Sequence, residues 1–178
     1  ACQAGTYNPN EGGQSHLSCL LADVGHFVPV EALTEQIRCP LGTFADEKGS
    51  IVCKEAAPGY MVSSTASDSA TACPLGAYQP ASGEDACIPA EQGFFVPTTA
   101  STNQTPCPVG TTTLGEGSVN ATSCFDDADN DGLANIVDDD DDNDGVMDGD
   151  DAFPLDASAS RPIVSCLLYT SPSPRDFG

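Results

Sequence analysis

The residues best suited to chemistry in this sequence are aspartates in two tandem acidic segments. The segments 127–138 and 140–151 both follow the pattern Asp-x-Asp-x-Asp-Gly-x-x-(Asp/Asn)-x-x-Asp, and they start thirteen residues apart. Side-chain oxygens therefore recur at positions one, three, five, nine and twelve. Calcium is a hard cation that takes about six to eight oxygen ligands, and a loop with this spacing can wrap around it. The pattern predicts two calcium-binding loops.

The predicted ligands are the five side chains of each loop and the main-chain carbonyl at position seven. They are Asp127, Asp129, Asp131, Leu133, Asn135 and Asp138 in the first loop, and Asp140, Asp142, Asp144, Val146, Asp148 and Asp151 in the second. Gly132 and Gly145, at position six, supply the backbone freedom for the chain reversal. Asp141 falls outside the ligand pattern.

Two other interpretations of these segments are weaker. A solvated acidic linker is the usual meaning of a block of like charge, but such a linker gives no reason for glycine to recur at position six in the same register. Magnesium keeps its own waters and favours few protein ligands. Ca²⁺ is therefore the expected cofactor.

The tandem loops, followed by Asp-Ala-Phe-Pro-Leu-Asp at 151–156, resemble thrombospondin type 3 repeats. They differ from an EF-hand, because position twelve is Asp rather than Glu and no amphipathic helix flanks either loop. The resemblance implies loops with little regular secondary structure that wrap around a string of calcium ions. Vertebrate members of that family place cysteines between the loops, whereas none lies between Cys124 and Cys166 here. Calcium alone is thus expected to order residues 126–156.

Charge and composition exclude several classes of function. The chain carries a formal charge of −22 with only five Lys and Arg, so nucleic acid and anionic membrane surfaces are not expected partners. There is no Trp, and 17 glycines and 14 prolines interrupt the 178 residues. We therefore expect no large core.

The nine cysteines indicate an oxidising, extracellular compartment. Zinc is the competing use of so many thiols, but the sequence has no Cys-x-x-Cys pair and only two histidines, which are not at ligand spacing. We therefore expect the cysteines to form disulfides.

The cysteines mark a repeat of about 34 residues. The segment 39–44 (CPLGTF) matches 73–78 (CPLGAY) and 107–112 (CPVGTT), and more loosely 2–7, and a Gly-aromatic signature follows the second cysteine of the first three units. The expected domains are cysteine-rich repeats at 1–38, 39–72, 73–106 and, in part, 107–125, followed by the calcium-binding repeats at 126–156 and a linker at 157–165.

The cysteine spacing permits two pairings that respect the repeat. The first joins Cys2 to Cys19, Cys39 to Cys53, Cys73 to Cys87 and Cys107 to Cys124; the second joins Cys19 to Cys39, Cys53 to Cys73 and Cys87 to Cys107. The first is preferred because it uses all eight cysteines. The segment from Cys39 to Cys53 also resembles the opening module of the cysteine-rich repeats in tumour-necrosis-factor receptors and ephrin receptors, in which the short loop is closed in this way.

The C-terminal residues 166–178 differ in character from the rest of the chain. Residues 166–176 resemble the translation of a sequencing adapter, which suggests an artefact in a truncated metagenomic sequence. Excluding Cys166 leaves an even number of cysteines. The remainder is expected to be an internal fragment of a longer secreted protein.

The predicted fold class is a row of small, disulfide-rich, elongated repeat modules, β-poor to β-rich, followed by an irregular calcium-ordered loop segment. No residue set suggests catalysis, so the chain is not expected to be an enzyme. The leading interpretation is a calcium-binding structural or adhesive stalk of a secreted or cell-surface protein, whose partners are calcium ions and extracellular protein or glycan ligands. The alternatives are an accessory region of a large extracellular hydrolase and a receptor-like ectodomain that binds a protein ligand.

Overall fold

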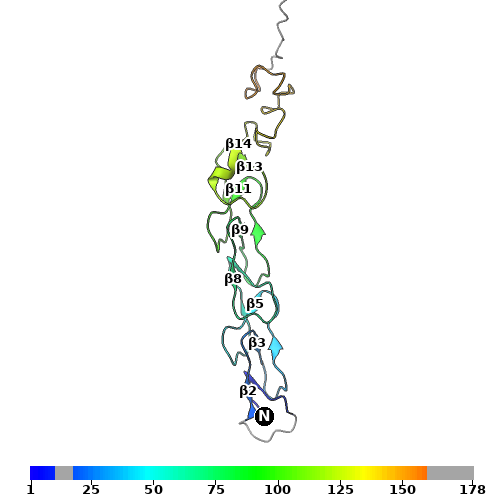
Figure 1. The fold of residues 1–178 in the computed structure, drawn as a ribbon, viewed down its shortest axis with the longest axis vertical. Helices are drawn as coiled ribbons and strands as arrows, with labels where there is room; N and C mark the ends of the chain where they lie inside the picture. Colours follow the sequence, from blue (N-terminus) through cyan, green and yellow to red (C-terminus); the bar gives the residue numbers. More distant parts are fainter. Residues whose placement is uncertain (11–17, 160–178) are drawn as a thin grey trace, which may run out of the picture.

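The protein is a long, narrow rod (Figure 1). The computed structural model describes residues 1–10 and 18–159. The chain advances along the rod from the N-terminus at one end to the acidic loops near the other. Residues 160–165 of the predicted linker and the whole 166–178 segment lie outside the described residues.

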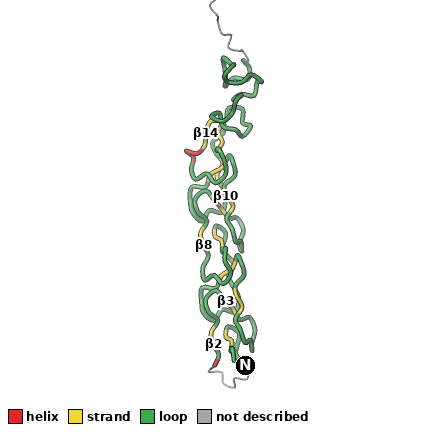
Figure 2. The backbone as a smooth tube through the Cα atoms, turned by 45° about the vertical axis from the view of Figure 1, so that its right-hand side comes forward, coloured by secondary structure: helices red, strands yellow, loops and turns green. Residues whose placement is uncertain are grey.

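Within the described residues, regular structure consists of short strands paired into seven antiparallel hairpins and a 3₁₀ turn, η2 (Ala121–Ser123), with loops between them (Figure 2). The pairs are β1 (Thr6–Tyr7) with β2 (Leu20–Leu21), β3 (His26–Phe27) with β4 (Ile37–Arg38), β5 (Thr43–Phe44) with β6 (Lys54–Glu55), β7 (Tyr60–Met61) with β8 (Thr71–Ala72), β9 (Ala77–Tyr78) with β10 (Ile88–Pro89), β11 (Phe94–Phe95) with β12 (Thr105–Pro106), and β13 (Thr111–Thr113) with β14 (Cys124–Asp126). From β3 onward, the first strands of successive hairpins begin 17 residues apart. Each predicted 34-residue repeat therefore contains two hairpins.

Disulfides close alternate hairpins. They join Cys2 to Cys19, Cys39 to Cys53, Cys73 to Cys87 and Cys107 to Cys124, which is the first of the two pairings that the spacing permits. In the hairpins between them, buried alanines occupy the place of the first cysteine: Ala22, Ala56 and Ala90.

A glutamine replaces the second cysteine in two of the hairpins that lack a disulfide. In the β3–β4 hairpin the side-chain oxygen of Gln36 accepts a hydrogen bond of 2.7 Å from the N–H of Asp23. Gln104 accepts the equivalent bond, 2.8 Å, from the N–H of Glu91. In the β7–β8 hairpin the same position is Ala70, which has no side-chain amide.

Main-chain hydrogen bonds stack each hairpin on the next. Gly42 N–H donates to Val62 O at 2.9 Å, and Ala56 N–H donates to Gly42 O at 2.9 Å. Gly42 has a positive φ of 76°, and a Cβ placed there would lie 1.8 Å from Gly83 O. Glycine is thus required both by the turn and by the close approach of the neighbouring backbone.

The core is a narrow column of small side chains. It holds Cys2, Cys39 and Cys73, the three alanines named above and, from β3 onward, one side chain six residues further along each hairpin: Val28, Ala45, Val62, Gln79, Val96 and Thr113. The predicted small-module, disulfide-rich class is confirmed at this level. None of the helices within the described ranges is long and apolar enough to cross a membrane.

Candidate metal centre

The acidic segment attaches to the last hairpin as if it began another one. Asp127 follows β14 directly, and its N–H donates to Gly110 O at 2.9 Å. Cys107 makes the equivalent bond to Gly93 O at 2.8 Å one hairpin earlier. Gln92 in the stack also donates a side-chain hydrogen bond of 2.6 Å to Gly132 O. The first predicted calcium loop is thus anchored to the end of the stack.

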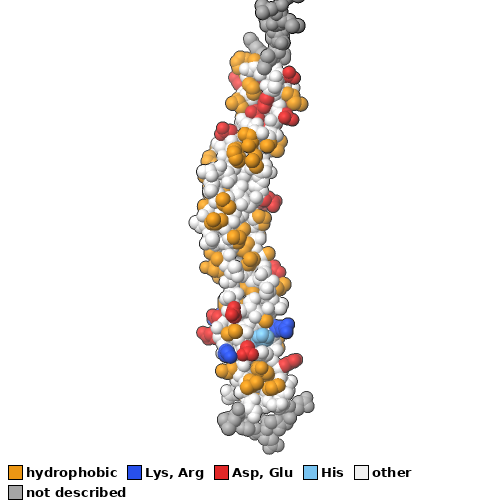
Figure 3. All heavy atoms as spheres, in the orientation of Figure 1, with side chains coloured by type: hydrophobic (Ala, Val, Ile, Leu, Met, Phe, Trp, Pro, Cys, Tyr) orange, Lys and Arg blue, Asp and Glu red, His pale blue; other side chains and the backbone are white. Residues whose placement is uncertain are grey.

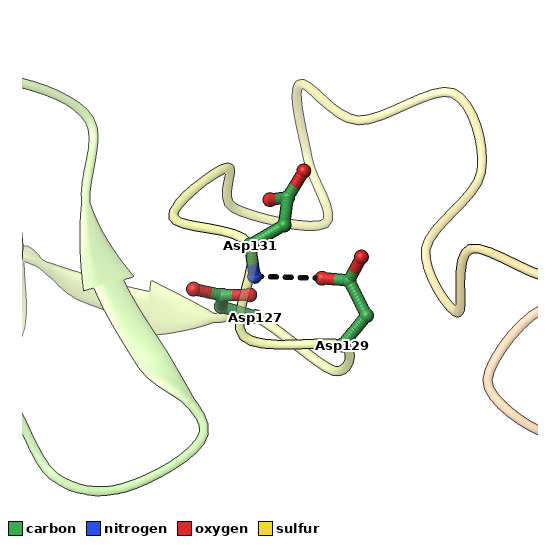
Figure 4. A group of neighbouring side chains, drawn as sticks. All are labelled: Asp127, Asp129 and Asp131. Atoms are coloured by element: carbon green, nitrogen blue, oxygen red, sulfur yellow. Dashed lines mark hydrogen bonds between the residues drawn. The ribbon is translucent and has the colours of Figure 1, made fainter.

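The first loop brings three predicted ligands together. Asp127, Asp129 and Asp131 leave one tight turn of the chain (Figure 4), and each offers a carboxylate oxygen within 4.8 Å of the other two. Asp131 N–H donates to Asp129 Oδ1 at 3.1 Å, and Leu133 N–H donates to Asp131 Oδ1 at 2.7 Å. Such bonds from a backbone N–H to the carboxylate two residues earlier are Asx turns, which fix the local fold of the loop.

The second loop repeats this geometry. Asp140, Asp142 and Asp144 form the second group of carboxylate oxygens within 4.8 Å of one another. Asp144 N–H donates to Asp142 Oδ1 at 3.1 Å, and Val146 N–H donates to Asp144 Oδ1 at 2.8 Å. Residues that lie thirteen positions apart in the sequence therefore have the same structural role in the two loops.

Position nine closes each loop. Asn135 Oδ1 accepts a 3.0 Å hydrogen bond from Ala128 N–H, and Asp148 Oδ1 accepts one of the same length from Asp141 N–H. Asp148 keeps a second carboxylate oxygen free of this bond, whereas Asn135 has only one side-chain oxygen. These bonds hold both predicted ligands beside the start of their loops.

Position twelve begins the next turn of the chain. Asp138 Oδ1 accepts from Asp140 N–H at 3.1 Å, and Asp151 Oδ1 accepts from Phe153 N–H at 3.0 Å. Asp151 is almost fully buried, with 2 % of its surface exposed. Asp151 therefore lies inside the folded loops, whereas Asp138 is half-buried.

Several carboxylate oxygens in the loops are inaccessible and accept no hydrogen bond. Five of them belong to predicted ligands: Asp127 Oδ1, Asp140 Oδ1, Asp142 Oδ2, Asp144 Oδ2 and Asp151 Oδ2. Leaving a charged group without water or a partner costs several kcal/mol. A bound divalent cation would supply the missing partner, and an all-oxygen set suits calcium. The residues present thus fit the predicted ion, most fully in the second loop.

The structure adds one acid that the ligand pattern leaves out. Asp141 is only 9 % exposed, and its Oδ1 is also without a partner. Burial raises the pKa of Asp141, and the nearby charges of Asp148 and Asp138 raise it further. The corresponding residue of the first loop is Ala128. Comparison of the two loops in sequence could have revealed this extra acid, but not its burial.

The loops also touch each other, because Asn143 donates a side-chain hydrogen bond to Asp129.

No protein-family model matches this sequence, and comparison with curated proteins gives no match either. The two loops and the hairpin stack are therefore interpreted from their own geometry.

Proposed function

We propose that this chain is a calcium-binding structural stalk of a secreted or cell-surface protein. The hairpin stack acts as a spacer, since each hairpin bonds mainly to its neighbours along one axis. The acidic loops, whose carboxylates lie at the end of the rod away from the N-terminus (Figure 3), form the calcium-dependent end of that spacer. The observation that best supports this role is the set of inaccessible, unpaired carboxylate oxygens at predicted ligand positions, one in the first loop and four in the second.

The proposed effect of calcium follows from the charge of the segment. Five consecutive aspartates occupy 138–142, and each pair of like charges about 4 Å apart repels by about 1 kcal/mol even in water. Calcium ions would neutralise part of this charge. At free calcium about tenfold above Kd, each site would stabilise the ordered loops by about 1.4 kcal/mol.

Anchoring at the stack decides where this stabilisation acts. Asp127 is both a predicted ligand and the residue that donates to Gly110 O. Calcium in the first loop would therefore fix the loop segment relative to the last hairpin, while the hairpins closed by disulfides stay folded without it. The expected outcome is a rod whose acidic end is stiff with calcium and soft without it.

The proposal can be tested by chelation. Adding excess EDTA to the oxidised protein should increase the radius of gyration and speed amide exchange in residues 127–151, while exchange in the hairpins of residues 22–106 stays unchanged. Magnesium at the same concentration serves as the control cation and should not restore the compact form. If the radius of gyration and the amide exchange are the same with and without calcium, the proposal is wrong and the segment is only an acidic linker.

A further inference from the structure

One recess in the hairpin stack is independent of the acidic loops. It has a volume of about 360 Å³ and lies between the β5–β6 and β7–β8 hairpins, at the small end of the usual range for ligand sites. Its lining combines two aromatic rings, Phe44 and Tyr60, with the carboxylates of Asp46, Glu55 and Asp68. Ala57, Ser69 and Ala70 complete it.

The recess exists where a glutamine is missing. Ala70 occupies the position that Gln36 and Gln104 hold in the other two hairpins without a disulfide. Each glutamine side chain crosses to the opposite side of its hairpin and bonds to a backbone N–H there. Alanine cannot make that bond. The space stays open, and the N–H of Ala57, a lining residue, donates no hydrogen bond within the described residues, whereas the corresponding N–H groups of Asp23 and Glu91 each donate to a glutamine.

The carboxylates at the recess are not a general feature of the repeat. One repeat further along the chain, prolines stand at the positions of Asp46 and Glu55 (Pro80 and Pro89), and Thr102 stands at that of Asp68. Gln104 fills the corresponding space. The chain therefore carries a closed copy of the same site, in which Glu91, at the position of Ala57, is the one carboxylate.

Two of the three carboxylates at the recess keep an uncompensated charge. Asp46 pairs with Lys54 at 2.7 Å. Glu55 accepts a 3.1 Å hydrogen bond from Ser82, and Asp68 accepts one of 2.9 Å from Ser69, but a hydroxyl leaves the negative charge in place. The recess thus favours a cation.

The aromatic rings narrow the choice of cation. A guanidinium group is flat, stacks on aromatic faces and presents N–H donors in a fork that matches carboxylates. The backbone carbonyl of the residue that carries it would offer an acceptor to Ala57 N–H. We propose that this recess binds an exposed arginine side chain of a partner protein. The assignment does not depend on calcium binding by the acidic loops.

The test is an NMR titration of the oxidised chain with N-acetyl-arginine methylamide in calcium-free buffer. Saturable shifts are expected for the amide signals of Ala57, Tyr60 and Ala70, whereas the equivalent signals of the closed site, at Glu91 and Gln104, should not move. The neutral analogue N-acetyl-citrulline methylamide should bind at least about tenfold more weakly, since it loses the charge-assisted hydrogen bonds. Equal binding of the two probes would overturn the proposal.

Matched variants separate the recess from general attraction to an acidic protein. Ala70→Gln should fill the recess and abolish the shifts without unfolding the chain, because glutamine already stands at this position in two hairpins. Asp68→Asn should weaken binding about tenfold. Asp85→Asn removes the same charge from the same position of the next hairpin and should leave binding unchanged. Binding that survives Ala70→Gln, or that falls equally in both Asp→Asn variants, would refute the site.

Discussion

Replacing Gly42 by alanine should break the stack at one defined place. The new Cβ would lie 1.8 Å from Gly83 O, so the two backbones must move apart. Two hydrogen bonds join this glycine to the next hairpin, to Val62 O and from Ala56 N–H, each 2.9 Å long. Losing both bonds and forcing alanine to a positive φ should cost about 4 kcal/mol.

Gly117→Ala is the matched control. Gly117 has nearly the same φ, 75°, but no atom lies within 4 Å of a Cβ placed there. At the equivalent turn one hairpin earlier the chain already has an alanine, Ala100, with a φ of 56°. This substitution should therefore lower the stability by only about 1 kcal/mol, which is the free energy needed to hold alanine in the left-handed conformation.

Amide hydrogen exchange of the oxidised protein is the appropriate assay, because a linear stack need not unfold in one step. Gly42→Ala should speed exchange at Ala56 by about a thousandfold, whereas Gly117→Ala should speed exchange of its own amide, which donates to Ala90 O, by only about fivefold. Similar effects of the two substitutions, each at its own local amide, would show that the turn conformation alone matters and that the close backbone contact is not what holds the hairpins together.

Three further predictions concern the acidic loops and the surface. Asp144→Ala should weaken calcium binding at least about tenfold in calorimetry, since it removes a predicted ligand that has an inaccessible, unpaired carboxylate oxygen. The exposed Asp150→Ala should change binding little, and equal losses would argue against the assigned ligands. Calcium at ten times its Kd should slow amide exchange at Asp127 about tenfold, and no slowing would show that the loop and the stack are uncoupled. The hydrogen bond from Lys54 lowers the pKa of Asp46. This pair therefore stabilises the fold at pH values above the ordinary carboxyl pKa, and the stabilisation is lost as the pH falls through the lowered pKa of Asp46. NMR titration of the Lys54→Met variant should show a higher pKa for Asp46, and an unchanged pKa would refute the pairing.

Much of the stack could be predicted from the spacing of its cysteines. The local pairing, as in Cys39 to Cys53, was preferred because it uses all eight cysteines, and the structure has it. The true period was harder to recognise, because only alternate hairpins carry cysteines. The Gly-aromatic signature at Gly59 is the same turn as the Cys-Pro-Leu-Gly signature at Gly42, and the equivalence becomes evident only when both glycines are seen to make the same bonds to the next hairpin.

The sequence predicts which residues of the two acidic loops correspond to each other, but not which of them are buried. Local hydrogen bonds to the backbone follow directly from the alternating aspartates, so both loops fold alike. The burial of Asp141 depends on how the second loop packs after the first, which residue spacing does not encode. The recess at Ala70 likewise depends on what a glutamine does in neighbouring hairpins.

The most direct test of the proposed stalk is calcium titration of the oxidised chain by isothermal calorimetry, with small-angle scattering on the same samples. The account predicts heat from at least two calcium ions with Kd of about 0.1 to 1 mM and a decrease in the radius of gyration as the sites fill. No calcium heat and no compaction at millimolar calcium would contradict it.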